Sequence, residues 1–223
     1  KFRQKMPGKV NEGFSMMLKI LGRVTSINVR KVLWALDELG TGYEQQDWGM
    51  PLRDPKVPEF LALNPNGQVP VLIDGDFVLW ESIAILGYIN QAYGKGAFLP
   101  ASPEQQALAM QWVLWQNNEM GSNWGYPLMS IVRKTPGYDD PQKLADNIAA
   151  WTVKMGIIEA HLAKGGSFVV GDSFSLADIA ITLGLHRWFA VPFEHAPMPA
   201  AEAYYRRMAE RPAAKAWLGP NTP

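Results

Sequence analysis

The chain has 223 residues, of which 48% are hydrophobic and 19% charged, and its 21 Lys and Arg balance 21 Asp and Glu. This neutral, apolar-rich composition argues against a nucleic-acid-binding protein and against a disordered chain. The absence of cysteine excludes disulfides, thiolate metal sites and any reaction in which the protein supplies a thiol.

Residues 1–16 mix charges with glycines and lack an apolar run of signal-peptide length, so we expect a flexible arm or an expression remnant there. No stretch of about 18 apolar residues occurs anywhere in the sequence. The three histidines show no zinc-binding spacing, and we expect no metal site. These features predict a cytoplasmic, soluble protein with neither a membrane nor a nucleic-acid partner.

Strand-like and helix-like segments alternate in residues 17–94. We expect strands at 18–21, 43–48, 69–73 and 77–80, and helices at 29–39, 58–63 and 82–93. Gly40 suits a helix C-cap, and Asp74-Gly75 suits a turn between two strands. The resulting order, β-α-β-α-β-β-α, predicts an α/β amino-terminal domain.

Turn-forming residues dominate 94–103, and we place a domain boundary there. Helical periodicity follows over 103–124, 141–163, 175–188 and 199–210, with a short last helix from 213. Ser175 and Asp178 have the spacing of a capping box, which predicts a structural role at a helix start. The sequence therefore predicts an all-α domain over 103–223.

The run NPNGQVPVLIDGDFVLWESIAI, from Asn64 to Ile85, carries the strongest chemical signal. Pro70 lacks an N–H group, which leaves the backbone of Val69 free to pair with an extended peptide, and Gln68 adds an amide beside it. Glu81 and Ser82 stand where a helix begins, a position that suits a carboxylate ligand. Taken singly, each of these residues also has a purely structural interpretation, as a turn, a helix cap or a first-turn acid.

This run and the order of elements together resemble the glutathione transferase superfamily, over about residues 17–218. The resemblance implies a thioredoxin-like domain with a site for glutathione as co-substrate, and a helical domain that supplies most of the pocket for the second substrate. It further implies a cis peptide bond before Pro70.

Residue by residue, the resemblance implies that the Val69 backbone binds the cysteinyl part of glutathione and that Gln68 assists. Glu81 and Ser82 would bind the γ-glutamyl end. Lys56 would face the glycyl carboxylate.

Activation of the thiol is assigned to the loop GRVTSINVRKV, after the first strand. No tyrosine precedes Tyr43 and no cysteine exists, and the loop is similar to that of serine-type, phi- and theta-like members. This similarity implies Ser26 as the catalytic hydroxyl, with Asn28 and then Thr25 as alternatives. From the residues alone, Ser26 or Asn28 would be a helix N-cap.

The chemistry requires a stabilised thiolate, because a thiol of pKa about 8.5 is only about 3% ionised at pH 7. Lowering that pKa by about two units takes about 2.7 kcal/mol, and a hydrogen bond to a charged group supplies about 1.5–3 kcal/mol. A single serine hydroxyl beside a helix end therefore suffices, without a histidine base.

Four residues are candidates for the pocket of the electrophile: Arg23, Val24, Trp115 and Trp124. The two tryptophans have an alternative interpretation as packing between domains.

The leading hypothesis is a glutathione S-transferase that conjugates glutathione to apolar electrophiles, with reduction of organic hydroperoxides as a second reaction of the same sulfur. The alternatives are glutathione-dependent isomerisation, for which the SSCS-type loop is missing, and a non-catalytic binding or interaction module with the same fold. The resemblance also implies a homodimer.

Overall fold

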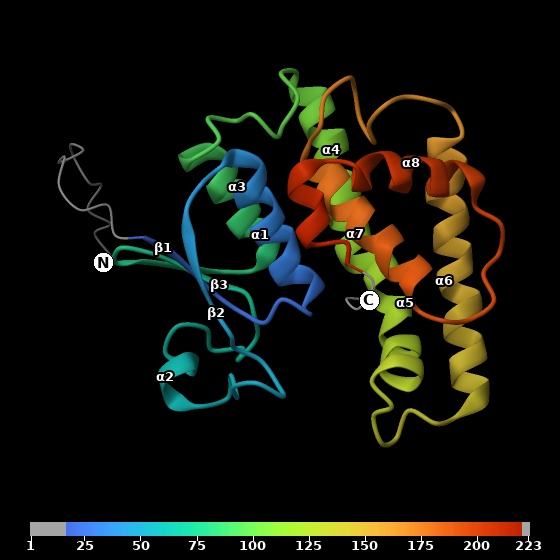
Figure 1. Cartoon of the computed structure of the whole chain (residues 1–223), viewed down its shortest axis with the longest axis horizontal. Coiled ribbons are helices and arrows are strands. Elements are labelled where there is room, and N and C mark those ends of the chain that lie inside the picture. The colour runs from blue at the N-terminus through green and yellow to red at the C-terminus, as the bar shows by residue number, and fades with distance from the viewer. Residues whose placement is uncertain (1–16, 220–223) are drawn as a thin grey trace.

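A computed structural model describes residues 17–219, so the arm expected at 1–16 lies outside the described residues. A small sheet with its helices forms one side of the molecule, and a group of longer helices forms the other (Figure 1). The order β-α-β-α-β-β-α followed by helices confirms the predicted fold class. The first set of elements comprises β1 (Leu18–Leu21), α1 (Ile27–Leu39), β2 (Tyr43–Gln46), α2 (Pro58–Leu61), β3 (Val71–Asp74), β4 (Phe77–Trp80) and α3 (Ser82–Ala92).

The sheet has the strand order β2-β1-β3-β4, in which β1 is parallel to β2 and antiparallel to β3, and β4 is antiparallel to β3. The register pairs Leu21 with Val71 and Val71 with Trp80. The end of β1, the start of β3 and the end of β4 therefore lie at one edge of the sheet. The loop after β1, the turn before β3 and the first residues of α3 meet at this edge.

Helix α1 begins after Ser26 and ends at Gly40, which has the left-handed conformation expected of a C-cap (φ 63°). Two of the predicted strands are displaced or shortened. β2 ends at Gln46 because the chain bends there and buries Trp48 against Phe60, and β3 begins at Val71, after the turn that contains Pro70.

The helical side comprises α4 (Pro103–Trp115), η1 (Gln116–Met120), α5 (Gly121–Pro127), η2 (Leu128–Val132), α6 (Pro141–Leu162), α7 (Leu176–Ala190), α8 (Pro199–Ala209) and the 3₁₀ turn η3 (Pro212–Ala216). The helix predicted to end at Trp124 continues to Val132. The π-helical turn η1 joins α4 to α5, which contains Gly125 and Pro127, and the π-helical turn η2 follows α5. Such wide turns are frequent at functional sites.

The capping box at the start of α7 is confirmed. The Ser175 hydroxyl accepts from the Ala177 N–H (3.2 Å), and the Asp178 carboxylate accepts from the Ser175 N–H (2.8 Å). Asp178 also accepts from the Tyr204 hydroxyl (2.6 Å). α7 is buried along most of its length, as expected of a helix that is apolar on all sides.

A continuous apolar core joins the two sides of the molecule across α1. Trp34 of α1 is fully buried, with its ring 6.0 Å from that of Phe174. Glu38 accepts two hydrogen bonds from the Arg211 guanidinium (2.8 and 2.6 Å), and the Trp217 indole donates to Asp37 (2.8 Å). The carboxy-terminal segment is thus fastened to the first helix.

Two negative findings apply to the described part of the chain. No helix within residues 17–219 combines the length and the apolar character needed to cross a bilayer. In the same range, no group of three or more histidine or carboxylate side chains is arranged to bind a metal ion.

Candidate active site

A small polar pocket of about 30 Å³ lies at the sheet edge where β1, β3 and β4 bring their loops together. Most of the residues predicted to bind glutathione meet in its wall. The lining residues are Asn28, Asn64, Asn66, Gln68, Val69, Pro70, Glu81 and Ser82.

Asn64 organises the turn that leads into this pocket. The Asn64 side-chain amide donates to the Gln68 backbone carbonyl (2.7 Å). The Asn64 backbone carbonyl accepts from the Gly67 N–H (2.9 Å). The Val69–Pro70 peptide bond is cis, as the resemblance implied. Asn64 and Asn66 were not among the predicted site residues, although both lie in the run that carried the signal.

Lys56 lies behind the turn rather than in the wall of the pocket. Its ammonium donates to the Asn66 carbonyl (2.6 Å), and its side chain packs close to Gly67. This contact positions the turn.

The start of α3 carries a strained residue. Glu81 has φ 73°, a left-handed conformation that is costly for a residue with a side chain, and it makes no cap hydrogen bond. Ser82 follows as the first helical residue and is 3% exposed. The geometry places the Glu81 carboxylate, the Ser82 hydroxyl and the positive end of the α3 dipole at one wall of the pocket.

Ser26 occupies the N-cap position of α1 but makes no side-chain cap hydrogen bond. It is half-buried and lines a second cavity, of about 350 Å³, between the two sides of the molecule. The helix-cap interpretation therefore describes the position of Ser26 in the backbone but not a bond of its hydroxyl.

Asn28 lines both the polar pocket and this second cavity. Its side-chain carbonyl accepts from the buried Lys31 ammonium (3.2 Å), which also donates to Asn117 of η1 (3.1 Å). The N–H groups of the Asn28 side chain are available to a ligand, because within residues 17–219 they donate no hydrogen bond. Lys31 thus orients Asn28 and ties α1 to the π-helical turn.

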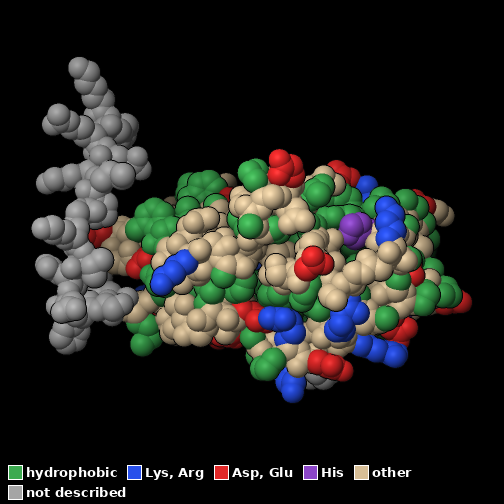
Figure 2. Space-filling model, turned by 90° about the horizontal axis from the view of Figure 1, so that it is seen from above, with side chains coloured by type: hydrophobic (Ala, Val, Ile, Leu, Met, Phe, Trp, Pro, Cys, Tyr) green, Lys and Arg blue, Asp and Glu red, His purple; other side chains and the backbone are tan. Residues whose placement is uncertain are grey.

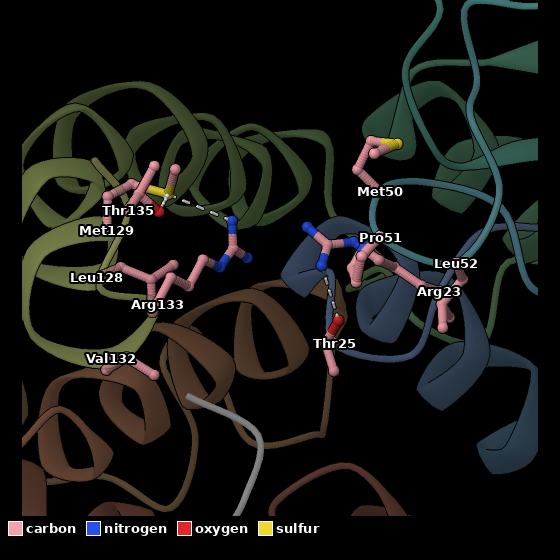
Figure 3. A pocket seen from close by; sticks show the side chains of 10 residues that line it. All are labelled: Arg23, Thr25, Met50, Pro51, Leu52, Leu128, Met129, Val132, Arg133 and Thr135. Carbon is pink, nitrogen blue, oxygen red and sulfur yellow. Dashed lines mark hydrogen bonds between the residues drawn. The ribbon is translucent and has the colours of Figure 1, made fainter. Parts of the chain in front are cut away.

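A larger cavity, of about 660 Å³, adjoins the second one, since both are lined by Arg23, Leu128, Met129 and Arg133. We call the two cavities together the cleft. Figure 3 shows the side chains that line the larger cavity, from the loops after β1 and β2 on one side and from the end of η2 on the other.

Of the four residues predicted to line the electrophile pocket, Arg23 and Trp124 line the cleft. Val24 and Trp115 are not among its lining residues. Val24 is exposed, and the Trp115 ring packs at 5.2 Å against the ring of Trp112. Trp124 is packed as well, with its ring 6.1 Å from that of Trp151, so it both packs in the core and lines the cleft.

Several lining residues of the cleft had no sequence signal, namely Met50, Pro51, Leu52, Leu128, Met129, Arg133 and Arg187. Arg187 lies on the buried helix α7, and Arg133 follows η2. Arg133 and Arg187 lie far along the chain from the loop after β1 that also lines the cleft, and tertiary packing brings these segments together.

Positive charge is concentrated at the cleft. Burial lowers the pKa of Arg187 well below its usual range, and the neighbouring Arg30, Arg133 and Arg23 lower it further. Burial, with a smaller effect of Arg187, lowers the pKa of Lys31 to about 7. A cleft of this kind stabilises an anion, including a thiolate, more strongly than water-exposed charges do.

Comparison with known families agrees with this geometry. Residues 16–91 match the family described as "Glutathione S-transferase, N-terminal domain", and residues 154–219 match "Glutathione S-transferase, C-terminal domain". The chain belongs to the glutathione S-transferase family.

Among relatives, Glutathione S-transferase GstB of Escherichia coli is 35% identical over 201 residues, which cover 89% of this chain and 96% of that protein. A theta class glutathione S-transferase from Xanthomonas axonopodis pv. citri, solved with glutathione bound, superposes with a TM-score of 0.84 at 32% identity, covering 90% of this chain and 96% of that one. Elongation factor 1-gamma 2 of Oryza sativa subsp. japonica is 32% identical over 170 residues, or 74% of this chain and 39% of that protein.

Proposed function

We propose that the protein binds glutathione in the polar pocket and conjugates its sulfur to an electrophile that lies in the cleft. The observation that carries this proposal is that Asn28 lines both the polar pocket and the cleft, and that Ser26, two residues earlier in the chain, lines the cleft. In the reaction the thiol loses its proton to solvent. The sulfur lone pair forms a bond to the electrophilic carbon, and the leaving group departs with its bonding electrons.

In this proposal Glu81 and Ser82 bind the γ-glutamyl end and the Val69 backbone binds the cysteinyl part. The strained backbone of Glu81 and the burial of Ser82 support it, since strain of this kind persists mainly where a ligand site requires it. The glutathione-bound structure among the relatives supports the same ligand.

We further propose that the Ser26 hydroxyl donates a hydrogen bond to the thiolate without removing its proton. Its lack of a cap hydrogen bond and its position at the positive end of α1 support this role. Asn28 is the alternative donor, because its amide nitrogen has no other partner in the described chain. Ser26→Ala and Asn28→Ala, compared in the same assay, decide between them.

The experiment that tests the function is calorimetric titration with glutathione, combined with an ultraviolet scan for the bound thiolate from about pH 5 to 9. We expect binding, with the thiolate forming well below pH 8. Binding without a shifted thiolate would contradict thiol activation. The absence of binding at millimolar glutathione would contradict the function itself.

The second candidate is a non-catalytic interaction module. The similarity to Elongation factor 1-gamma 2 favours it, because the matched region makes up only 39% of a protein whose name describes no transferase. The titration separates the two candidates, since a module that has lost the reaction has no reason to lower the pKa of a bound thiol.

We also propose a homodimer. The edge strand β4 exposes Phe77 (44%) and Trp80 (37%), and α4 exposes Leu108 (47%) and Leu114 (45%). A second copy of the chain would cover these side chains. Sedimentation velocity is expected to give about twice the 24.8 kDa mass of one chain, with Phe77→Asp shifting the protein toward the monomer. A monomer at micromolar concentration would contradict the proposal.

A further inference from the structure

Two guanidinium groups face one another across the cleft. Arg23 follows β1, and Arg133 follows η2 on the helical side, and their side chains point toward each other in Figure 3. Both residues line both cavities of the cleft. The arrangement brings together two positive charges from segments more than a hundred residues apart in the chain.

Neither arginine has a carboxylate partner within residues 17–219. In the described chain, the Arg23 guanidinium donates only to the Thr25 hydroxyl (3.2 Å), and the Arg133 guanidinium only to the Met129 sulfur (3.5 Å). The described wall of the cleft contains no Asp or Glu. Other arginines of the chain are paired, such as Arg53 with Glu59 and Arg211 with Glu38. Arg23 and Arg133 therefore differ from Arg53 and Arg211 in that no carboxylate of the described chain neutralises them.

The two arginines affect each other electrostatically. Burial lowers the pKa of Arg23, and the neighbouring Arg133 lowers it further. Two like charges that face each other repel, and an anion between them relieves this repulsion. Arginine suits the task, because its planar fork of donors matches a carboxylate.

This positive charge is not part of a general basic surface. The whole chain has a formal charge of zero. On the face in Figure 2, Lys and Arg side chains lie among Asp and Glu side chains rather than in one basic patch. The cleft is therefore a local concentration of positive charge on a neutral protein.

Apart from Thr25 and Thr135, the rest of the larger cavity is apolar. Met50, Pro51 and Leu52 form one wall, and Leu128 and Val132 form part of the other. Met50 and Leu52 are 61% and 59% exposed, so they offer apolar surface that a ligand can cover. A ligand that fits this cavity has an apolar body and an anionic group.

We propose that the second substrate is an electrophile with an apolar body and a carboxylate, and that Arg23 and Arg133 bind the carboxylate between them. This inference rests on the proposed function and names the substrate class of the same site. The two arginines act as specificity residues, because they bind the substrate away from the reacting carbon. The remaining step is the one given above: the sulfur–carbon bond forms, and the leaving group departs with its electron pair.

A matched pair of aryl chlorides tests the proposal, namely 4-chloro-3,5-dinitrobenzoate and its neutral amide, 4-chloro-3,5-dinitrobenzamide. Each enzymatic kcat/KM is divided by the uncatalysed rate of the same compound with glutathione, which removes the difference in intrinsic reactivity. We expect the benzoate to be preferred by about 10- to 100-fold, and Arg133→Gln and Arg23→Gln each to abolish most of this preference. Arg133→Lys should restore part of it. Lys134→Gln, which removes the adjacent charge outside the cleft wall, should leave the preference unchanged.

Binding of the chlorine-free compounds, 3,5-dinitrobenzoate and 3,5-dinitrobenzamide, gives a measurement that does not require turnover. Calorimetry should show tighter binding of the benzoate to the wild type and equal binding of both compounds to Arg133→Gln. This result would uphold the inference even if no conjugation were seen, in which case only the proposed function would fail. Equal binding of both compounds to the wild type would overturn the inference.

Glutathione itself offers a competing carboxylate at its glycyl end. If Arg23→Gln and Arg133→Gln raise the KM of glutathione and leave the preference between benzoate and amide intact, the pair binds the peptide and the inference is overturned. We expect the KM of glutathione to change by less than about twofold in both variants.

Discussion

The polar pocket and the cleft adjoin at Asn28, yet they are built from different parts of the chain. Most of the polar pocket comes from one run of sequence, from Asn64 to Ser82, folded back by the antiparallel strand pair β3–β4. The cleft combines the loops after β1 and β2 and the start of α1 with residues of η1, α5, η2 and α7. The first region uses amides, a hydroxyl and one carboxylate, whereas the second uses arginines and apolar side chains. Local sequence specifies the first region, and tertiary packing specifies the second.

The largest effect is expected where the two regions meet. Ser26→Ala should lower kcat about 100-fold with every electrophile, because the hydrogen bond stabilises the thiolate more than the bound thiol. Glutathione affinity, measured by calorimetry, should stay within about twofold. Turnover equal to that of the wild type would remove Ser26 from the reaction, and a loss confined to Asn28→Ala would transfer the role to Asn28.

A smaller effect is expected from the polar pocket alone. Ser82→Ala removes a buried hydroxyl at the start of α3 and should raise the Kd of glutathione about tenfold. The preference between anionic and neutral electrophiles should not change, because Ser82 lies outside the wall of the cleft. Titration calorimetry and the paired electrophile assay measure these two quantities. A change in electrophile preference would show that the two regions are coupled.

The order of elements and the capping box at Ser175 and Asp178 could be predicted, because caps, turns and alternating patterns are local. The resemblance of one run of sequence to a known family named most of the residues that line the polar pocket, but not Asn64 and Asn66. Arg133 could not, because it lies beyond the predicted end of its helix. The sequence did not show which of Trp115 and Trp124 lines the cleft. The π-helical turn η1 between them changes the rotation of the helix, and a period of 3.6 residues does not predict that change.

Lys31, which bonds Asn28 at the junction of the two regions, should make the free energy of unfolding depend on pH. Its pKa falls from an ordinary 10.5 to about 7 through burial, so between these values the unfolded chain binds more protons than the folded chain. The free energy of unfolding should therefore rise with pH over this window. Urea denaturation from about pH 7 to 10 should show a steeper rise for the wild type than for Lys31→Met. Identical slopes would mean that Lys31 titrates normally.

The smallest effect is expected at residues that lie outside the cleft wall. Val24→Ser and Trp115→Phe should each leave the KM of the aryl electrophiles within about twofold. Steady-state kinetics with both compounds of the matched pair measure this. A change in KM above tenfold for Val24→Ser would place Val24 in the binding surface after all.

The fastening of α1 to the carboxy-terminal segment limits how the protein can be divided. Trp34 packs beside Phe174, and Glu38 and Asp37 are held by Arg211 and Trp217. A fragment ending near residue 94 would expose this apolar face of α1 to water and remove the bonds of Glu38 to Arg211 and of Asp37 to Trp217. The glutathione side is therefore not a transplantable module. Both sides should unfold in one cooperative transition, with equal calorimetric and van't Hoff enthalpies.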